Sequence, residues 1–341
     1  MSTASLLTLD YGIRNEFHLN GIDTITMALY EEKNPEDISI SQVLPIINIF
    51  LPDVTLKGLK FLYHGTYNVF EVEKRYIFRI PDKSLRNNKG IQMIEKEKEI
   101  LQLLKPNLSI SIPDPIFLNL DEKVPSMGYE KLPGVSLSKC IRKFDSKCLK
   151  KLARAIGAFL SQLHSPQNTE DFKNHFNMDN SNFLTRYQQV WEKEYQEIKS
   201  IVWPLINQTQ KKWIQNLYTC YMTKIDDFSF EPTVIHGDFD TSNILVDSIS
   251  CNLSGIIDFE EANIFDPAVD FLFFREGKPF LEEILKSYKG VVDKDFKERM
   301  KFTFSRSCFP YMLYGSHNNI PSLIEAGLEL LSDRMEFFPY E

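Results

Sequence analysis

The spacing of hydrophobic and polar positions differs between the two halves of the chain. Between residues 57 and 81 the runs LKFLY, VFEV and YIFRI are short and rich in β-branched and aromatic residues, and turn-prone segments join them. This pattern predicts three antiparallel strands. A helix is predicted from about residue 91 to 104, and further strands near 116–120 and 127–132. The first 130 residues therefore predict a small sheet that carries one helix.

After Pro133 and Gly134 the apolar residues recur at intervals of three and four, beginning with Leu149, Leu152 and Ile156, as one face of an amphipathic helix requires. More helices are predicted over residues 183–200, 209–225, 280–289, 295–314 and 321–337, interrupted only by two apolar strands at 244–246 and 255–257.

A β-rich lobe followed by a helical lobe indicates an α+β fold. We divide the chain into an N-lobe at residues 55–131 and a C-lobe at residues 132–341. Residues 1–54 precede the sheet as an extension without a usable motif.

Composition and charge narrow the classes of function. The chain has 341 residues, of which 43% are hydrophobic and 25% charged, and these proportions exclude a disordered protein. Lys and Arg number 39 against 47 Asp and Glu, which gives a net charge of −8. This charge argues against a nucleic acid or an anionic membrane as partner and favours a small cationic molecule.

The cysteines indicate a reducing compartment. There are five of them, without a C-x-x-C pair and far apart in the sequence, so neither a disulfide framework nor a zinc site is expected. The opening residues lack the pattern of a signal peptide, and the most apolar run, residues 43–51, is too short to span a membrane. We therefore expect a cytoplasmic protein.

The most specific motif is VIHGDFDTSNILV, followed by SGIIDF. It places Asp238, Asn243 and Asp258 at intervals of five and fifteen residues, each of the last two next to a predicted strand. Two carboxylates and an amide at one point are what phosphoryl transfer needs, because a carboxylate orients the attacking hydroxyl and oxygen atoms hold magnesium on the nucleotide phosphates. Any one of these residues alone would be read as a solvated loop residue.

HGDFDTSNILVD together with GIIDFEEANIFDPAVDF resembles the catalytic and metal-binding segments of the aminoglycoside phosphotransferase family. The resemblance implies a protein-kinase-like bilobal fold. It further implies that Asp238 is the catalytic base or positioning group and that Asn243 and Asp258 bind Mg²⁺. In this family His236 would brace the loop, and the two aspartates of DPAVDF, Asp266 and Asp270, would be structural.

The resemblance covers about residues 57–337 and adds the nucleotide site. Gly65 would lie in the loop that covers the phosphates, or in a plain hairpin turn. Arg79 shares a strand face with Ile77 and stands where kinases place a phosphate-binding lysine; otherwise it is a surface residue. Glu97 would pair with Arg79 or lie on an exposed helix face.

The segment YEKLPG resembles the hinge of the family. The backbone groups of Glu130 and Leu132 would bind the edge of a purine, and Tyr129 would lie at the back of the pocket. A bulky residue there would narrow an adenine site, so the resemblance implies GTP or ATP as donor, with GTP favoured.

The expected acceptor is inferred from the positions at which this sequence departs from the family pattern and from its acidic residues. Glu260 replaces the glycine of the family's DFGDA, and the Ala-Pro-Glu anchor of protein kinases is missing, so a small hydroxylated substrate is expected. Asp240, Glu260 and Glu261 are candidate acceptor-binding residues. The C-terminal segments 309–315 and 325–331 resemble the aminoglycoside 2''-phosphotransferases, which implies an aminoglycoside acceptor and antibiotic resistance.

Two alternatives remain open. The same fold serves kinases of the choline, homoserine and macrolide types, so the fold alone does not identify the acceptor. Arg79, Glu260 and the unexplained first 54 residues also leave room for a catalytically silent nucleotide-binding module.

Overall fold

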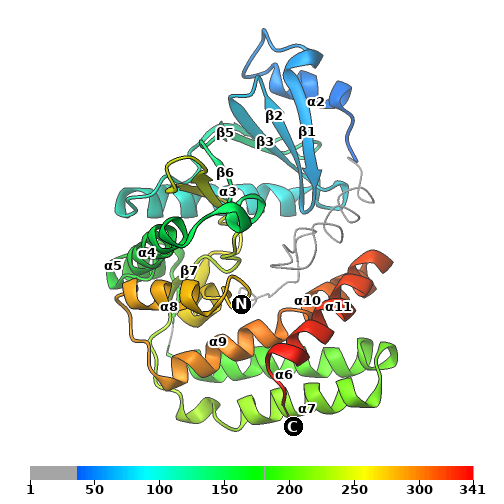
Figure 1. The fold of residues 1–341 in the computed structure, drawn as a ribbon. Coiled ribbons are helices and arrows are strands. Elements are labelled where there is room, and N and C mark those ends of the chain that lie inside the picture. The colour runs from blue at the N-terminus through cyan, green and yellow to red at the C-terminus, as the bar shows by residue number, and fades with distance from the viewer. Residues whose placement is uncertain (1–36, 180, 341) are drawn as a thin grey trace.

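Five antiparallel strands form the sheet of the smaller lobe, in the order β1-β2-β3-β5-β4 (Figure 1). The structure is a computed structural model and describes residues 37–179 and 181–340. The strands are β1 (Leu59–His64), β2 (Tyr67–Val72), β3 (Tyr76–Pro81), β4 (Pro115–Asn119) and β5 (Ser126–Glu130). They confirm the five strands that the sequence predicts in this region.

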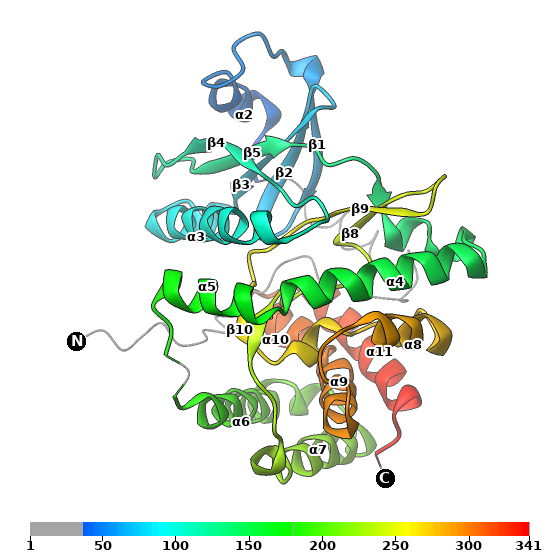
Figure 2. The same cartoon turned by 90° about the vertical axis from the view of Figure 1, so that its left-hand side faces the viewer.

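A helix covers each face of this sheet (Figure 2). On one face lies α3 (Asn88–Leu104), whose Ile94 is buried among the side chains of β2, β3 and β5. On the other face lies α2 (Ile40–Ile47), whose Val43 is buried in the same cluster as Phe78 of β3. Because both faces are covered, nearly every residue of β2 and β3 is buried.

The helix α2 belongs to the segment in which the sequence offers no usable motif. Its buried residues, Val43, Ile46 and Ile47, follow the three-and-four spacing of a helix face. Residues 37–54 thus contribute to the core of the sheet. Residues 1–36 of the predicted extension lie outside the described residues.

Helices dominate the larger lobe. They are α4 (Ser146–Leu163), α5 (Pro166–Phe176), α6 (Phe183–Ile201), α7 (Gln208–Met222), α8 (Lys278–Ser287), α9 (Lys294–Arg306), α10 (Phe309–His317) and α11 (Pro321–Phe337). In Figure 2, α4 and α5 cross the middle of the molecule between the N-lobe and the remaining helices. The apolar spacing therefore predicts the helical character of this lobe.

Two helices differ from the prediction. The single helix expected over 295–314 is wrong: α9 ends at Arg306 and α10 begins at Phe309. Pro310 stands in the first turn of α10, where its missing N–H costs little, whereas it would break a continuous helix. The helix α5 was not predicted, because its sequence PQNTEDFKNHF is mainly polar.

Two small sheets flank the segments 236–243 and 257–262, which carry the sequence motif. One has the order β6-β8-β9, formed by β6 (Val135–Ser136), β8 (Ile244–Asp247) and β9 (Asn252–Ile256). The other pairs β7 (Thr233–Ile235) with β10 (Asn263–Phe265). The sequence predicts β8 and β9 but not the other three, whose runs of two or three residues give no readable period.

Cys148 and Cys251 form a disulfide, with their Cα atoms 5.5 Å apart. The expectation that the cysteines lie too far apart for disulfide bonding was wrong for this pair. Its residues are 103 positions apart in the sequence, but the fold brings the first turn of α4 beside the turn between β8 and β9. Among the described residues, no helix is both long and apolar enough to cross a membrane.

Candidate active site

Asp238 lies in a loop whose backbone is held by Asp270. The strand β7 leads directly into His236, Gly237 and Asp238. The carboxylate of Asp270 accepts hydrogen bonds from the backbone N–H of His236 at 2.7 Å and of Gly237 at 3.0 Å. It also lies 3.0 Å from Nε2 of the buried His164. Because Asp270 is fully buried and binds three partners, it fixes the loop in one conformation.

Gly237 is required by this conformation. Its φ is +86°, a value that other residues rarely adopt. A Cβ atom on it would lie 2.7 Å from the backbone oxygen of Glu261. The glycine of the H-G-D motif therefore allows the segment after Asp258 to pass close behind the loop.

Asn243 contacts Asp238, and the segment that carries Asp258 is bonded to Asn243. Asn243 Nδ2 donates to Asp238 Oδ2 at 2.8 Å and to the backbone oxygen of Asp238 at 2.9 Å. The backbone N–H of Ile257, next to Asp258, donates to the backbone oxygen of Asn243 at 3.0 Å. The structure thus brings together the three residues that the motif singles out.

His236 links the same two segments. Its Nε2 donates to the backbone oxygen of Ile257 at 3.0 Å, and its Nδ1 accepts from the backbone N–H of Asp238 at 3.3 Å. Both ring nitrogens are therefore used by the backbone, and the side chain is fully buried. This geometry matches the bracing role that the resemblance implies.

Arg79 connects the N-lobe to the loop segment that carries Asp258. Its Nη1 donates to Glu97 of α3 at 2.5 Å. Its Nη2 donates to Asp258 Oδ1 at 3.1 Å and to Glu260 Oε2 at 2.9 Å. The side chains of Arg79 and Glu97 are both buried. The alternatives that Arg79 is a surface residue and that Glu97 lies on an exposed helix face are therefore excluded.

Three carboxylates neutralise the positive charge of the buried Arg79 guanidinium. Burial alone would lower the pKa of Arg79, but Glu97, Asp258 and Glu260 hold that pKa well above its ordinary value. The ring of Tyr67 lies 4.1 Å from the guanidinium carbon and covers it. Three carboxylates around one cation leave this site acidic, which suits the later arrival of a divalent ion.

The predicted hinge residues lie where the two lobes join. Tyr129 of β5 is buried and faces Ile77 of β3 in the strand register. The side chain of Glu130 points to the surface and pairs with Arg75 at 2.8 Å, so only its backbone can serve a ligand. Leu132 packs close to the hairpin of β8 and β9, because a Cβ atom on Gly255 would lie 2.8 Å from Leu132 Cδ1.

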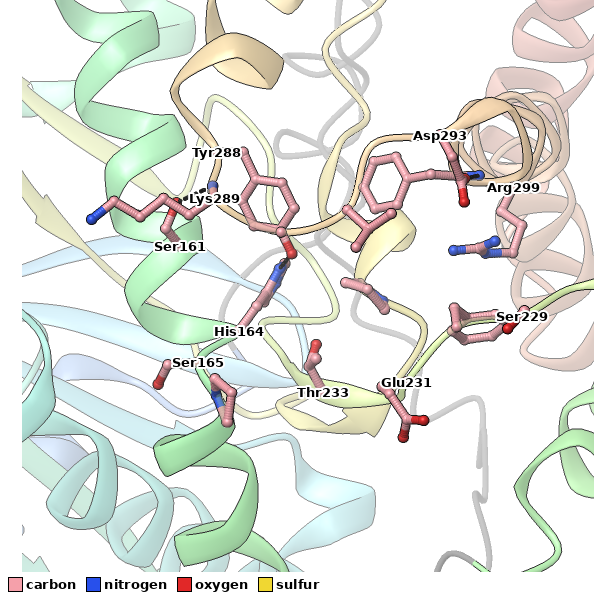
Figure 3. A pocket seen from close by; sticks show the side chains of 16 residues that line it. Ser161, His164, Ser165, Ser229, Glu231, Thr233, Tyr288, Lys289, Asp293 and Arg299 are labelled. Carbon is pink, nitrogen blue, oxygen red and sulfur yellow. Dashed lines mark hydrogen bonds between the residues drawn. The ribbon is translucent and has the colours of Figure 1, made fainter.

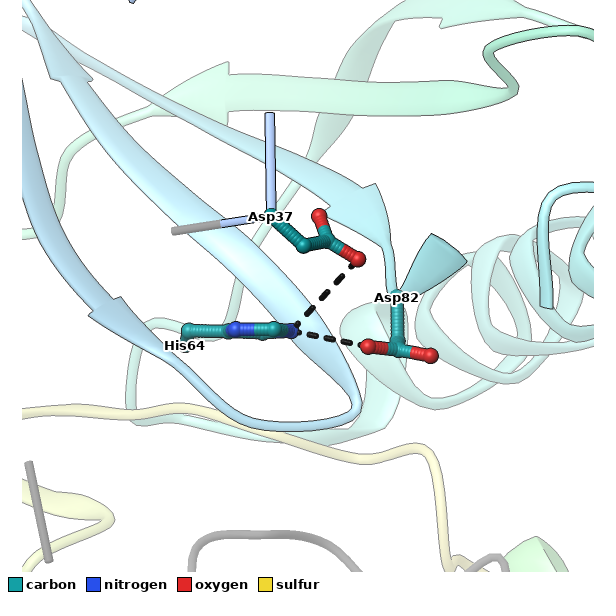
Figure 4. Close-up of side chains that lie close together, drawn as sticks. All are labelled: Asp37, His64 and Asp82. Carbon is teal, nitrogen blue, oxygen red and sulfur yellow. Dashed lines mark hydrogen bonds and ion pairs between the residues drawn. The ribbon is translucent and has the colours of Figure 1, made fainter. Parts of the chain in front are cut away.

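The turn between β1 and β2 carries Gly65, whose N–H donates to the backbone oxygen of Tyr67 at 2.9 Å. Beside it, His64 Nε2 lies 2.9 Å from Asp82 and 3.9 Å from Asp37 (Figure 4). These three side chains are near enough to share a metal ion, but the guanidinium of Arg86 already pairs with Asp37. We interpret them as the anchor that holds this turn against residue 37.

Of the candidate acceptor residues, Asp240 lies in the loop, and Glu260 and Glu261 lie in the segment after Asp258. Asp240 is buried, and its Oδ1 accepts from the backbone N–H of Ser242 at 2.7 Å. Glu260 binds Arg79, and Glu261 lies beside Gly237.

Glu276 is a titratable residue near Asp240 that the sequence does not predict. Burial, together with the charge of Asp240, raises the pKa of Glu276 to about 7. Nothing in the run FREGK signals this.

A cavity of about 590 Å³ lies behind the loop, and none of the three motif residues lines it (Figure 3). His164, Thr233, Tyr288 and Arg299 are among its walls. His164 connects it to the loop through Asp270. The cavity is therefore separate from the site around Asp238.

A family comparison agrees with this geometry. Residues 58–293 match the model of a family described as the phosphotransferase enzyme family. This span is more than half of the chain, and it includes Arg79, Glu97, Asp238, Asn243 and Asp258.

Solved structures are similar over most of the chain. The GDP complex of wild-type aminoglycoside 2'-phosphotransferase-IIIa has 24% identity and a TM-score of 0.76, over 88% of this chain and 100% of that one. The streptomycin-ATP-APH(2")-IIa ternary complex has 20% identity and a TM-score of 0.63, over 87% and 97%. Macrolide 2'-phosphotransferase MphH from Brachybacterium faecium has 17% identity and a TM-score of 0.62, and the match covers 85% of this chain and 97% of that one. These similarities show the protein-kinase-like fold.

Proposed function

We propose that this chain, which belongs to the phosphotransferase enzyme family, transfers the γ-phosphoryl group of GTP or ATP to a hydroxyl group of a cationic aminosugar. The observation that carries the proposal is the convergence of Asp238, Asn243 and Asp258, together with the buried pair of Arg79 and Glu97. A silent module would not need all five of these residues in place.

The catalytic step follows from the position of Asp238. Its carboxylate would accept the proton of the acceptor hydroxyl while the hydroxyl oxygen attacks the γ-phosphorus. The bond from that phosphorus to the bridging oxygen breaks, and the nucleoside diphosphate leaves with the electron pair. Asn243 fixes the carboxylate through Nδ2 at 2.8 Å, so Asp238 is oriented before the substrate arrives.

The donor atoms at this site fit Mg²⁺. Asn243 uses its amide nitrogen on Asp238, which leaves the amide oxygen as its metal-binding atom. The carboxylate of Asp258 supplies a second type of oxygen ligand. A bound magnesium ion would neutralise charge on the phosphates, and these two residues would hold it.

Arg79 would take the phosphate role that lysine has in kinases. Its two terminal nitrogens serve different partners: Nη1 binds Glu97, and Nη2 binds Asp258 and Glu260. We infer that a phosphate oxygen replaces Glu260 on Nη2, while Glu97 keeps the guanidinium in place. The planar, bidentate guanidinium suits this exchange.

The donor is a purine nucleotide on this proposal. Glu130 and Leu132 would bind the purine through their backbone groups, with Tyr129 behind it. Similar structures are described with GDP and with ATP, so both donors are retained and the buried tyrosine favours GTP.

Acidity around the loop supports a cationic acceptor. Asp240, Glu261 and Glu276 lie near Asp238 in the chain or in the fold, and the whole chain carries −8. Similar structures are described with kanamycin and with gentamicin. The similarity to a macrolide phosphotransferase supports a macrolide as the alternative acceptor.

The test is a transfer assay with each donor and three classes of acceptor. The protein is incubated with MgGTP or MgATP and with kanamycin, gentamicin or streptomycin, then with a macrolide, and then with choline and homoserine. Mass spectrometry should show a phosphorylated aminoglycoside. Product from the macrolide alone would leave the kinase class standing and overturn the aminoglycoside as acceptor.

A further inference from the structure

The disulfide between Cys148 and Cys251 attaches a helix to the hairpin that carries the candidate metal ligands. Cys148 lies in the first turn of α4, and Cys251 lies in the turn between β8 and β9. Asn243 directly precedes β8, and Asp258 follows β9 by two residues. The bond therefore fixes one end of the hairpin, and both candidate ligands stand at the other.

The turn keeps its shape through other bonds. Asp247 accepts from the backbone N–H of Ile249 at 2.9 Å and from the hydroxyl of Ser250 at 2.8 Å. Lys151 of α4 donates to the backbone oxygen of Ser250 at 2.9 Å. Breaking the disulfide would therefore remove one of the links between the hairpin and α4 without unfolding the turn.

The surroundings of the two sulfurs favour reversible chemistry. Cys251 is partly exposed, whereas Cys148 is 6% exposed and lies in the main core of the C-lobe. The ammonium group of Lys151 donates to the backbone oxygen of Ser250, the residue next to Cys251. Cys251 is thus the sulfur that a small thiol or disulfide would reach first.

We propose that Cys148 and Cys251 are a redox modification site that controls how firmly the hairpin holds metal and nucleotide; the second part rests on the proposed function. In the oxidising direction the Cys251 thiolate attacks glutathione disulfide, forming a mixed disulfide and releasing one glutathione. The Cys148 thiolate then displaces the second glutathione. The protein loses two electrons and two protons, and glutathione disulfide gains the two electrons.

The first experiment asks whether the bond forms and stabilises the protein. The full chain is treated with glutathione disulfide or with dithiothreitol, labelled with a maleimide, and melted. The bond closes a loop of about 100 residues, so the oxidised form should melt about 7 °C higher. The variant C148S/C251S should melt like the reduced protein and ignore the redox treatment.

Cys220 supplies the matched control, because it is a free and exposed cysteine. The variant Cys220→Ser should keep the full difference between the oxidised and reduced forms. Maleimide labelling of both Cys148 and Cys251 after the oxidising treatment, or equal melting temperatures, would overturn the proposal. Neither measurement requires the protein to act as a kinase.

The second experiment tests the coupling to the site. Calorimetric titration with MgGTP and MgATP should give a Kd about two- to fivefold lower for the oxidised protein, because the tether has already ordered the hairpin. Equal affinities in both forms would overturn the coupling. If neither form binds a nucleotide, the proposed function fails, and the redox site is judged by the melting experiment alone.

Discussion

The catalytic loop and the Arg79 cluster are held together in different ways. In the loop, Asp238 and its neighbours are positioned mainly by backbone hydrogen bonds to Asp270, His236 and Asn243. In the cluster, one buried guanidinium binds carboxylates that are 18 to 181 positions away in the sequence. The loop is thus a local structure, whereas the cluster depends on how the two lobes meet.

Because of this difference, substitutions in the loop should affect the reaction, and substitutions in the cluster should affect the stability of the fold. A change in the side chain of Asp238 removes the reacting group but leaves the bonds that the Asp238 backbone makes with His236 and Asn243. A change at Arg79 leaves three carboxylates clustered without their cation, and the cost falls on the fold itself. Substitutions in the two regions should therefore fail in different assays.

The largest effect on turnover is expected at Asp238. Asp238→Asn should lower kcat by at least about 10²-fold, because the proton acceptor is lost. Its melting temperature and nucleotide Kd should stay near those of the wild type. Asp227→Asn, at an exposed aspartate, is the control and should keep full activity. Comparable turnover in Asp238→Asn would remove its assigned role.

Arg79 should show the opposite pattern. Arg79→Met should destabilise the protein by about 3–5 kcal/mol, since Glu97, Asp258 and Glu260 remain buried or partly buried together. Arg75→Met is the matched control, because Arg75 directly precedes β3 and its exposed pair with Glu130 should contribute little to stability. Urea unfolding of both variants decides it: equal losses would contradict a special role for the buried cluster.

Glu276 offers a test through pH. Its pKa rises from 4.5 to about 7 in the folded protein, so the folded state keeps a proton that the unfolded chain has lost between these values. Stability from this group therefore falls as pH rises through that window. Glu276→Gln should gain about 2 kcal/mol relative to wild type between about pH 5.5 and 8. A pH-independent difference would show that Glu276 titrates normally.

The smallest effect is expected at the base pocket. Tyr129→Met should improve kcat/KM for ATP relative to GTP by about tenfold, which is about 1.4 kcal/mol. Competition kinetics with both donors measures the ratio directly. An unchanged ratio would show that the buried tyrosine does not select the base.

The sequence could predict what is local. Strands β1 to β3 follow from short runs of β-branched and aromatic residues between turn-prone segments. Asp238, Asn243 and Asp258 lie within a stretch of 21 residues, so one hairpin is enough to bring their segments together. The pair of Arg79 and Glu97 could be predicted only through the family resemblance, because no local pattern links these two residues. The contacts of Arg79 with Asp258 and Glu260 were not predicted. The roles assigned to these residues remain predictions.

Other features depend on packing that a single sequence does not display. The helix α2 is apolar but only eight residues long, and Pro45 interrupts its pattern, whereas α5 is mainly polar. The Cys148–Cys251 pair is separated by 103 residues, and Glu276 meets Asp240 only in the fold. In each case the deciding neighbour comes from a distant part of the chain.

The measurement that tests the central claim most directly is product formation from one nucleotide and one aminoglycoside. The wild-type protein, with Mg²⁺ and GTP or ATP, should convert kanamycin or gentamicin to a product heavier by one phosphoryl group, and Asp238→Asn should form at least about 10²-fold less of it in the same time. No phosphorylated product from any hydroxylated acceptor, or equal yields from the two proteins, would contradict the account.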